Sequence, residues 1–205
     1  MPEYSAPPDI HTNAYCELPT SIPMNLWHDI PTGKNPPEEL NVVIEIPKGS
    51  NNKYEVDKKT GLIALDRANY NAAAYPFDYG FVPQTLWEDG DPLDAVVLST
   101  FPLAPGILVR VRPVAMFDMN DSGDSDAKII AVPVEDPRWE DVEDLPDLNK
   151  HALKEYKHFF ETYKLLKDDD PRSHDVVVNG ILGKADAIKA IEHSMELYEL
   201  RHGAP

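Results

Sequence analysis

Hydrophobic and polar residues alternate in several short stretches through the first two thirds of the chain. In residues 41–46, Val42, Ile44 and Ile46 alternate with Val43 and Glu45, which is the period of a β-strand. Turn-forming residues follow, and the alternation then resumes, so residues 41–57 are predicted to form a β-hairpin. Further strands are predicted at residues 62–67, 94–99, 107–117 and 128–134. Many short strands separated by turns favour a closed antiparallel barrel with helices outside it.

The helical period is found near the C-terminal end of the sequence. Between residues 148 and 166 apolar side chains recur every three or four positions, which predicts an amphipathic helix. A second stripe from Ile188 to Tyr198 predicts a C-terminal helix, and residues 176–178 predict a last short strand. The predicted fold class is therefore mainly β with helices (α+β), a β-barrel core with two C-terminal helices packed outside.

The N-terminal part of the chain has a different composition. Prolines at positions 7, 8, 19, 23, 31, 36 and 37 interrupt any regular period, which predicts a surface arm over residues 1–40. A partner-binding polyproline segment is the alternative, although a regular P-x-x-P array is missing. Residues 41–205 are predicted to form one domain, long enough to bury a core.

The charge and the cysteine content limit which classes of partner and which cellular compartment are expected. The formal net charge of −17 argues against nucleic acid and anionic membranes as partners and favours cations, although salt adaptation gives the same composition. The single cysteine, Cys16, excludes an intrachain disulfide and suits a reducing compartment. Residues 1–30 lack the features of a secretory signal, and no apolar run approaches the length of a membrane span. A cytoplasmic location is predicted.

The most informative stretch sets three carboxylates, Asp89, Asp91 and Asp94, directly before an apolar run. Carboxylates this close raise one another's pKa and destabilise the fold unless cations neutralise them. Gly90 and Pro92 stiffen the loop, and the following strand anchors it. A solvated acidic turn is one interpretation. A rigid anionic loop on a core strand favours the other, a site for a hard, oxygen-binding metal such as Mg²⁺.

A second acidic cluster, Asp118, Asp121, Asp124 and Asp126, lies between two predicted strands. It resembles the front half of an EF-hand loop, but Ile129 occupies the position where a bidentate Glu is needed, and the flanks are strands. We therefore reject an EF-hand and predict a hairpin loop, either solvated or able to bind a metal.

Several basic and phenolic groups complete the candidate chemistry. Each alone is ordinarily a surface or core residue. Together with an acidic metal-binding set they would suit a small polyphosphate anion, because metals neutralise some oxygens while Lys, Arg and Tyr donate to the others. The set is Lys53, Arg67, Tyr75, Tyr79, Lys128, Tyr163 and Lys164.

Residues 89–94, Asp-Gly-Asp-Pro-Leu-Asp, resemble the D-x-D-P-x-D signature of the family I soluble inorganic pyrophosphatases. Further blocks resemble that family in the same order, at residues 43–47, 53–57, 65–67, 75–80, 121–128 and 159–164. The resemblance implies a five-stranded barrel of OB type. It also implies a Mg²⁺-dependent diphosphatase that hydrolyses inorganic pyrophosphate to two orthophosphates by direct attack of a metal-activated water, without a phosphoenzyme. Members of this size are commonly homohexamers.

The resemblance also implies roles for single residues. Asp91 matches the general base, and Glu45 matches a carboxylate that supports the site through water. The residues that match ligands of several Mg²⁺ ions are Glu55, Asp89, Asp94, Asp121 and Asp126. The residues that match the substrate-binding set are Lys53, Arg67, Tyr75, Tyr79, Lys128, Tyr163 and Lys164.

Two other functions stay open at this point. A metal-dependent phosphatase acting on organic phosphates or nucleotides would use similar groups, although no base or ribose pocket is obvious in the sequence. A non-catalytic OB-type module for nucleic acid would need a basic groove with stacking aromatics, which the charge of −17 disfavours. The expected partner is inorganic pyrophosphate as substrate, with no nucleic acid and no membrane, in a homo-oligomer.

Overall fold

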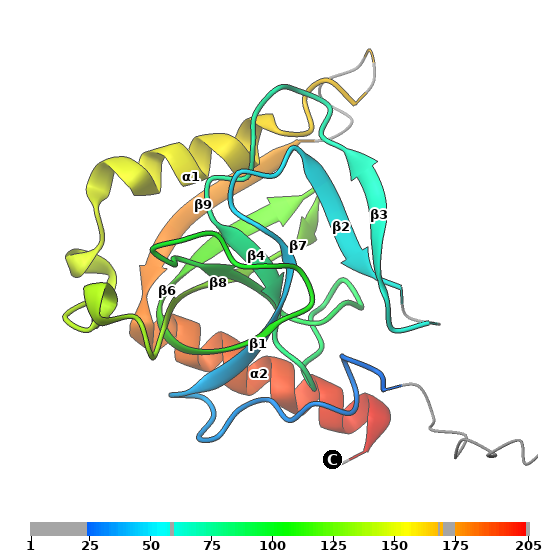
Figure 1. Ribbon diagram of the computed structural model, residues 1–205, viewed down its shortest axis with the longest axis vertical. Helices are drawn as coiled ribbons and strands as arrows, with labels where there is room; N and C mark the ends of the chain where they lie inside the picture. The colour runs from blue at the N-terminus through cyan, green and yellow to red at the C-terminus, as the bar shows by residue number, and fades with distance from the viewer. Residues whose placement is uncertain (1–23, 58–59, 168, 170–174, 204–205) are drawn as a thin grey trace, which may run out of the picture.

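The computed structural model describes residues 24–57, 60–167, 169 and 175–203 (Figure 1). It contains β-strands, short 3-10 helices (η) and two α-helices. The strands are β1 Leu40–Ile46, β2 Asn52–Val56, β3 Ile63–Ala68, β4 Asp78–Phe81, β5 Asp94–Val97, β6 Leu108–Asp121, β7 Asp124–Ser125, β8 Lys128–Pro133 and β9 Val176–Gly183. The helices are η1 Pro137–Trp139, η2 Leu145–Asp147, α1 Lys150–Thr162 and α2 Lys184–His202.

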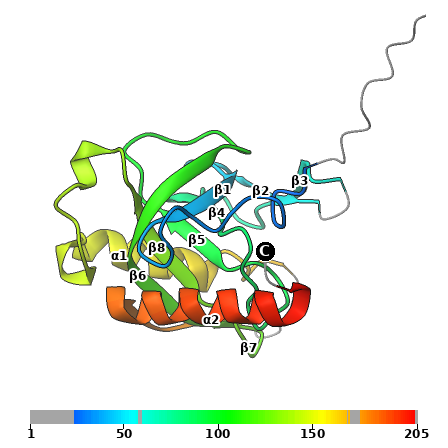
Figure 2. The ribbon, with the colours of Figure 1, turned by 90° about the horizontal axis from the view of Figure 1, so that it is seen from below.

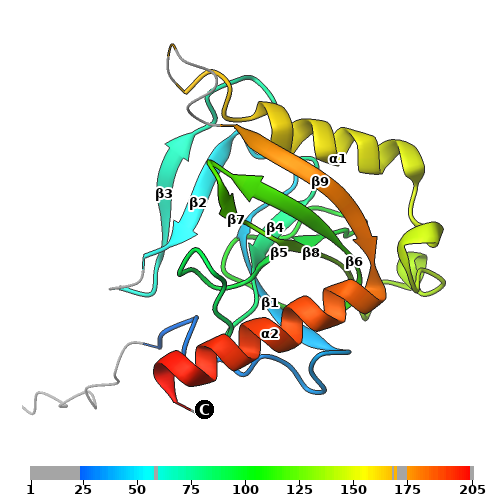
Figure 3. The same ribbon diagram turned by 180° about the vertical axis from the view of Figure 1, so that it is seen from behind.

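Five strands form a closed ring in the order β1, β4, β5, β8 and β6, and the ring closes because β6 also pairs with β1. β7 and β9 extend the sheet from β6, which is long enough to pair with several neighbours. The helices α1 and α2 lie outside this ring, as Figures 1 and 3 show. The predicted barrel with two outer helices is confirmed.

The prediction of an antiparallel barrel is wrong for one pair of strands. β5 and β8 run parallel, with Asp94 opposite Lys128 and Val97 opposite Ala131, whereas the other pairs of the ring are antiparallel. The chain reaches β8 only after passing through β6, so β5 and β8 are not joined by a tight turn. A parallel pair requires such a longer crossover.

The predicted hairpin over residues 41–57 is also wrong. β1 pairs with β4 and β6, while β2 pairs with β3 in a separate two-stranded sheet that projects beside the barrel in Figure 1. Turn-forming residues do separate β1 from β2. The chain changes direction there, but the two strands that flank the turn do not pair with each other. β4 was not predicted as a strand at all.

A close contact between β1 and β4 re-aims one side chain. Ile44 lies opposite Gly80 and Ile46 lies opposite Tyr79, so Glu45 is the extra residue of a β-bulge. The strands approach closely here, because a Cβ atom added to Gly80 would lie 1.9 Å from the carbonyl oxygen of Val43. Glycine is therefore needed at position 80 for the two strands to pair this closely.

The two helices cover different core clusters. Successive residues of β8 alternate, so that Ile130 packs with Phe159 and Phe160 of α1, while Ile129 packs with Ile191 of α2. Figure 2 shows α2 running along one side of the barrel, and Figure 1 shows α1 above the barrel and α2 below it. Within the described residues, no helix combines the length and apolar character needed to cross a bilayer.

The predicted arm is only partly described. Residues 1–23, including Cys16, lie outside the described residues. In the described part, Trp27 is buried with Val43, Phe81 and Tyr198 in a small third core cluster. The boundary between arm and domain at residue 40 stays a prediction.

Candidate active site

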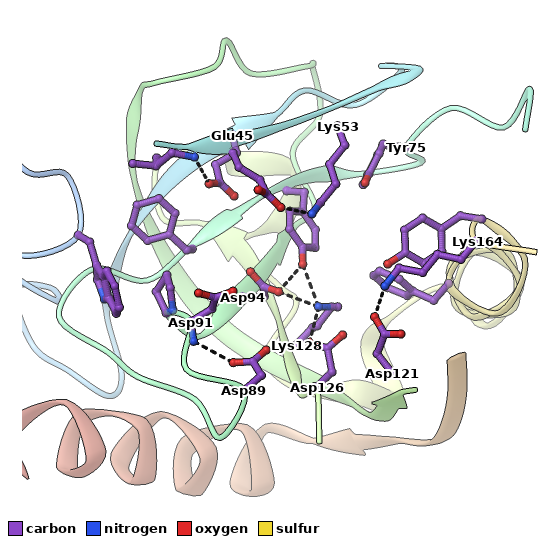
Figure 4. A pocket seen from close by; sticks show the side chains of 18 of the residues that line it. Glu45, Lys53, Tyr75, Asp89, Asp91, Asp94, Asp121, Asp126, Lys128 and Lys164 are labelled. Atoms are coloured by element: carbon purple, nitrogen blue, oxygen red, sulfur yellow. Dashed lines mark hydrogen bonds and ion pairs between the residues drawn. The ribbon is translucent and has the colours of Figure 1, made fainter. Parts of the chain in front are cut away.

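One pocket, of about 250 Å³, gathers most of the candidate residues (Figure 4). Its acidic lining residues are Glu45, Glu55, Asp89, Asp91, Asp94, Asp121 and Asp126. Its basic and phenolic lining residues are Lys53, Lys128, Lys164, Tyr75, Tyr79 and Tyr163. These residues come from six strands, the loops beside them and the end of α1, so only the closed fold brings them together.

Among the residues that the family resemblance assigns to the site, Arg67 alone does not line the pocket. It lies opposite Lys53 in the β2–β3 ladder, where its guanidinium bonds to Asp66 and lies 5.2 Å from the centre of the Tyr70 ring. Lys53 lines the pocket, so Arg67 is placed beside the site and not in its wall.

The shape of the acidic loop between β4 and β5 is fixed by backbone hydrogen bonds. The Trp87 N–H donates to the Asp91 carbonyl at 2.7 Å, and the Gly90 N–H donates to the Trp87 carbonyl at 3.0 Å. Gly90 has φ +89°, in the left-handed region that glycine tolerates best. The Asp91 N–H donates to the Asp89 carboxylate at 3.0 Å. The loop therefore turns tightly and presents both carboxylates to the pocket, as Figure 4 shows.

Lys128 connects the two acidic clusters at the start of the parallel strands. Its ammonium lies 2.7 Å from Asp94 and 2.8 Å from Asp126, and it donates to the Tyr79 hydroxyl at 2.9 Å. Tyr79 in turn donates to Asp94. The Lys128 side chain is only 4% exposed. Three segments distant in sequence therefore share one buried network.

The pKa directions in this network follow from burial and charge. Burial raises the pKa of Asp94, and the charge of Asp126 adds to that rise while Lys128 opposes it. Burial alone would lower the pKa of Lys128, but the two carboxylates raise it well above its ordinary value. Lys128 therefore keeps its charge, and desolvation raises the pKa of Tyr79 so that it stays a hydroxyl donor.

The other two lysines also pair with carboxylates, and Lys53 has a second partner in Asp66 at 3.4 Å. Lys164 bonds to Asp121, and Lys53 bonds to Glu55 (Figure 4). Burial acts to raise the pKa of Asp121, but the hydrogen bond and charge of Lys164 lower it below its ordinary value. The ammonium groups thus lie against carboxylates throughout the pocket.

Glu45 and Asp89 are carboxylates whose charge is poorly compensated. The bulge turns Glu45 towards the N–H of Val56, which donates to it at 2.8 Å. Burial nevertheless raises the pKa of Glu45 to about 8, with a further contribution from Asp94. Burial likewise raises the pKa of Asp89 to about 6. Both carboxyls resist ionisation without added positive charge.

The donor set fits divalent cations. Seven carboxylates and three lysines line the pocket, so negative charge is in excess, and oxygen ligands of this type suit Mg²⁺. In the part of the chain that the structure describes, no three acidic or imidazole groups already converge as the ligands of one ion. Lys128 explains this at the centre of the site, because its ammonium lies between Asp94 and Asp126. A cation binding there would have to separate the lysine from these carboxylates.

Several lining residues were missed in the sequence. They are Asn25, Trp27, Val56, Phe81, Pro92 and Phe160. Pro92 lies inside the acidic motif, and Phe160 places its ring 5.9 Å from the Lys128 ammonium. Trp27 carried a usable signal, since a large aromatic residue in a polar, proline-rich segment suggests a packed anchor. Its position beside the pocket depends on tertiary contacts.

Fold and pocket together define a class of protein: a small β-barrel whose acidic pocket attracts cations and carries lysine and tyrosine donors suited to an oxyanion. A sequence model of the inorganic pyrophosphatase family matches residues 42–199. The chain belongs to the inorganic pyrophosphatase family.

Relatives and solved structures agree with this assignment. Soluble inorganic pyrophosphatase 1 of Arabidopsis thaliana is 46% identical over 178 residues, covering 87% of this chain and 82% of that protein. The inorganic pyrophosphatase of Haloferax volcanii is 46% identical over 176 residues, covering 86% and 97%. The crystal structure of inorganic pyrophosphatase from Thermus thermophilus superposes with a TM-score of 0.82 at 44% identity, covering 86% of this chain and 99% of that one. The expected OB-type fold and the resemblance that implied it are thereby confirmed.

Proposed function

We propose that the protein hydrolyses inorganic pyrophosphate to two orthophosphates in this pocket, with divalent cations and by direct attack of water. The observation that carries the proposal is the convergence of seven carboxylates with lysines and tyrosines in one pocket of a chain from this family. An acidic pocket repels pyrophosphate on its own. Cations must therefore reverse the local charge before the anion is bound.

Mg²⁺ is the proposed cation, held by Asp89, Asp94 and Asp126, with Asp121 and Glu55 available for further ions. These are hard carboxylate ligands of the kind that Mg²⁺ prefers. Bound cations of this kind supply Lewis acidity and make hydroxide available near neutral pH. Glu45, which the bulge in β1 places in the lining of the pocket, is the proposed supporting carboxylate.

The proposed substrate-binding groups are the lysines and tyrosines of the lining, with Arg67 beside them. Each lysine contacts a carboxylate in the proposed metal-binding set: Lys128 contacts Asp94 and Asp126, Lys164 contacts Asp121, and Lys53 contacts Glu55. Carboxylates that turn to a cation release these ammonium groups to the phosphate oxygens. Burial raises the pKa values of Tyr75 and Tyr163, so both phenols stay protonated and donate hydrogen bonds.

Asp91 is the proposed general base. It lies at the tip of the stiff loop, between Asp89 and the segment that leads to Asp94, and it lines the same pocket. A carboxylate there orients the attacking water and accepts its proton, while the lysines stabilise the charge that develops on the leaving phosphate.

The test measures phosphate release from pyrophosphate with millimolar Mg²⁺, alongside samples with excess chelator and with ATP as substrate. We expect fast release that the chelator abolishes and much slower release from ATP. Asp91→Asn should lose most turnover while still binding Mg²⁺. Asp186→Asn is the matched control, because Asp186 is an exposed residue of α2 paired with Lys189. Comparable rates on ATP and pyrophosphate would instead support a phosphatase for organic phosphates.

Three finer features belong to the same proposal. A homohexamer, a cytoplasmic location and Mg²⁺ as the physiological ion stay predictions. Sedimentation of the purified protein tests the first, and metal-specific activity profiles test the last.

A further inference from the structure

Trp27 is anchored to the base of the acidic loop. Its indole N–H donates to the Thr85 carbonyl at 2.8 Å in a buried contact, and its own carbonyl accepts from the Gln84 N–H at 2.8 Å. The side-chain amide of Gln84 reaches the His28 carbonyl at 3.0 Å. Gln84 has φ +52°, which is unfavourable for a residue with a side chain and is held here by these contacts.

Thr85 links the two ends of that loop, which together form its neck. Its hydroxyl donates to the Val82 carbonyl at 2.6 Å and accepts from the Leu93 N–H at 2.9 Å. The Val82 N–H also donates to the Leu93 carbonyl at 2.9 Å. Asp89 and Asp91 lie between these two ends. The position of Thr85 therefore fixes how the loop enters and leaves the barrel.

The segment around Trp27 is fixed on its other side by α2. The ring nitrogen Nδ1 of His28 lies 2.7 Å from the Tyr198 hydroxyl, and the rings of Trp27 and His28 stack at 4.5 Å. Trp27 and Asn25 also line the pocket itself. The segment is thus clamped between a helix and the acidic loop.

We propose that Trp27 is a positioning residue for the metal-binding carboxylates. It acts through Thr85, whose hydrogen bonds set the placement of Asp89 and Asp94 relative to Asp126 across the pocket. Residues 25–28 then belong to the active site and not to a separate arm. This inference rests on the proposed function, since it assigns those carboxylates to cations.

The test is Trp27→Phe, which keeps an aromatic ring and removes the N–H donor. Mg²⁺ binding is measured calorimetrically without pyrophosphate. We expect the Mg²⁺ affinity to fall by about fivefold to tenfold, near the lower end of the loss seen when residues that support metal ligands are changed. Turnover should fall at low Mg²⁺ and recover at saturating Mg²⁺, with little change in KM for pyrophosphate.

Trp139→Phe is the matched control. Among the described residues the indole nitrogen of Trp139 is buried without a hydrogen-bond partner, so this substitution removes no such bond. Its Mg²⁺ affinity should equal that of the wild type. A role of Trp27 in folding alone predicts a lower unfolding midpoint with unchanged Mg²⁺ affinity, and that result would overturn the inference.

A second pair of variants tests the same link if Trp27→Phe does not fold. Thr85→Val removes the hydroxyl at the neck and should weaken Mg²⁺ binding, while Thr85→Ser keeps the hydroxyl and should restore it. Equal affinity in these two variants would contradict the proposed link. If the variants bind Mg²⁺ more weakly but the wild-type protein does not hydrolyse pyrophosphate, the proposed function is refuted and the positioning role of Trp27 still holds.

Discussion

Lys128 offers the sharpest test of how the pocket is stabilised. Lys128→Met keeps most of the side-chain volume and removes the ammonium that contacts Asp94, Asp126 and Tyr79 at 2.7 to 2.9 Å. With the lysine gone, the two carboxylates face each other in a site where the lysine side chain was 4% exposed. We therefore expect this variant to lose stability far beyond what lost packing would cause.

The expected loss is about 3–5 kcal/mol of unfolding free energy, which is the usual cost of removing one partner from a buried ion pair. This is a large share of the roughly 5–15 kcal/mol that stabilises a typical domain. The loss should shrink in acid. Burial already raises the pKa of Asp94, and without Lys128 it should rise further, so protonation relieves the repulsion as the pH falls.

Urea unfolding followed by tryptophan fluorescence, in chelator and at pH 5 and pH 8, measures this loss. The control is Lys189→Met, because Lys189 is 72% exposed in its pair with Asp186 and should cost less than about 1 kcal/mol. Added Mg²⁺ should stabilise Lys128→Met more than the wild type, since the cation replaces the missing charge. A loss at pH 8 no larger than that of the control would refute the reasoning.

Three further changes test other parts of the structure. Gly80→Ala should cost about 3 kcal/mol in urea unfolding, because its Cβ would lie 1.9 Å from the Val43 carbonyl oxygen; wild-type stability would contradict the β1–β4 register. In the metal-free wild type, stability should fall as the pH rises from about 4.5 to about 8, because the folded state keeps a proton on Glu45 that the unfolded state releases. Glu45→Gln should remove this fall. At high pH the variant should therefore unfold with a higher free energy than the wild type, by an upper bound on the order of 4–5 kcal/mol. The same pH dependence of the unfolding free energy in both proteins would contradict this expectation. Lys164→Ala should raise KM for pyrophosphate about tenfold, since a charge-assisted contact is lost. Its unfolding midpoint should change little because the pair with Asp121 is partly exposed, and a large drop in that midpoint without a rise in KM would argue for a structural role.

The parts of the site that the residue pattern predicts without the family resemblance are local in sequence. Asp89, Asp91 and Asp94 stand within six residues of one another, so the backbone alone keeps them close together. The strand and helix periods were also visible, because α1 and α2 each bury one face against the barrel. Local patterning was sufficient for these features.

The parts that were missed depend on pairing between distant segments. The turn after β1 does not determine that β2 joins β3 while β1 joins β4 and β6. Side-chain alternation is the same for parallel and antiparallel strands, so it carried no sign of the β5–β8 orientation. Trp27 owes its position to contacts with segments distant in sequence, among them Thr85 and α2. Such features follow from tertiary packing.

The parallel orientation of β5 and β8 also determines where the chain tolerates insertions and deletions. Both strands begin at the same edge of the barrel, with Asp94 and Lys128 as cross-strand neighbours, so the two acidic loops enter side by side. A residue deleted within either strand would turn every later side chain of that strand to the opposite face, so the core residues that follow this pair would lose their register. Length changes beyond Val97 or Pro133 lie at the other edge and leave the pair in register. Natural length variation in such chains should therefore concentrate where these two strands end.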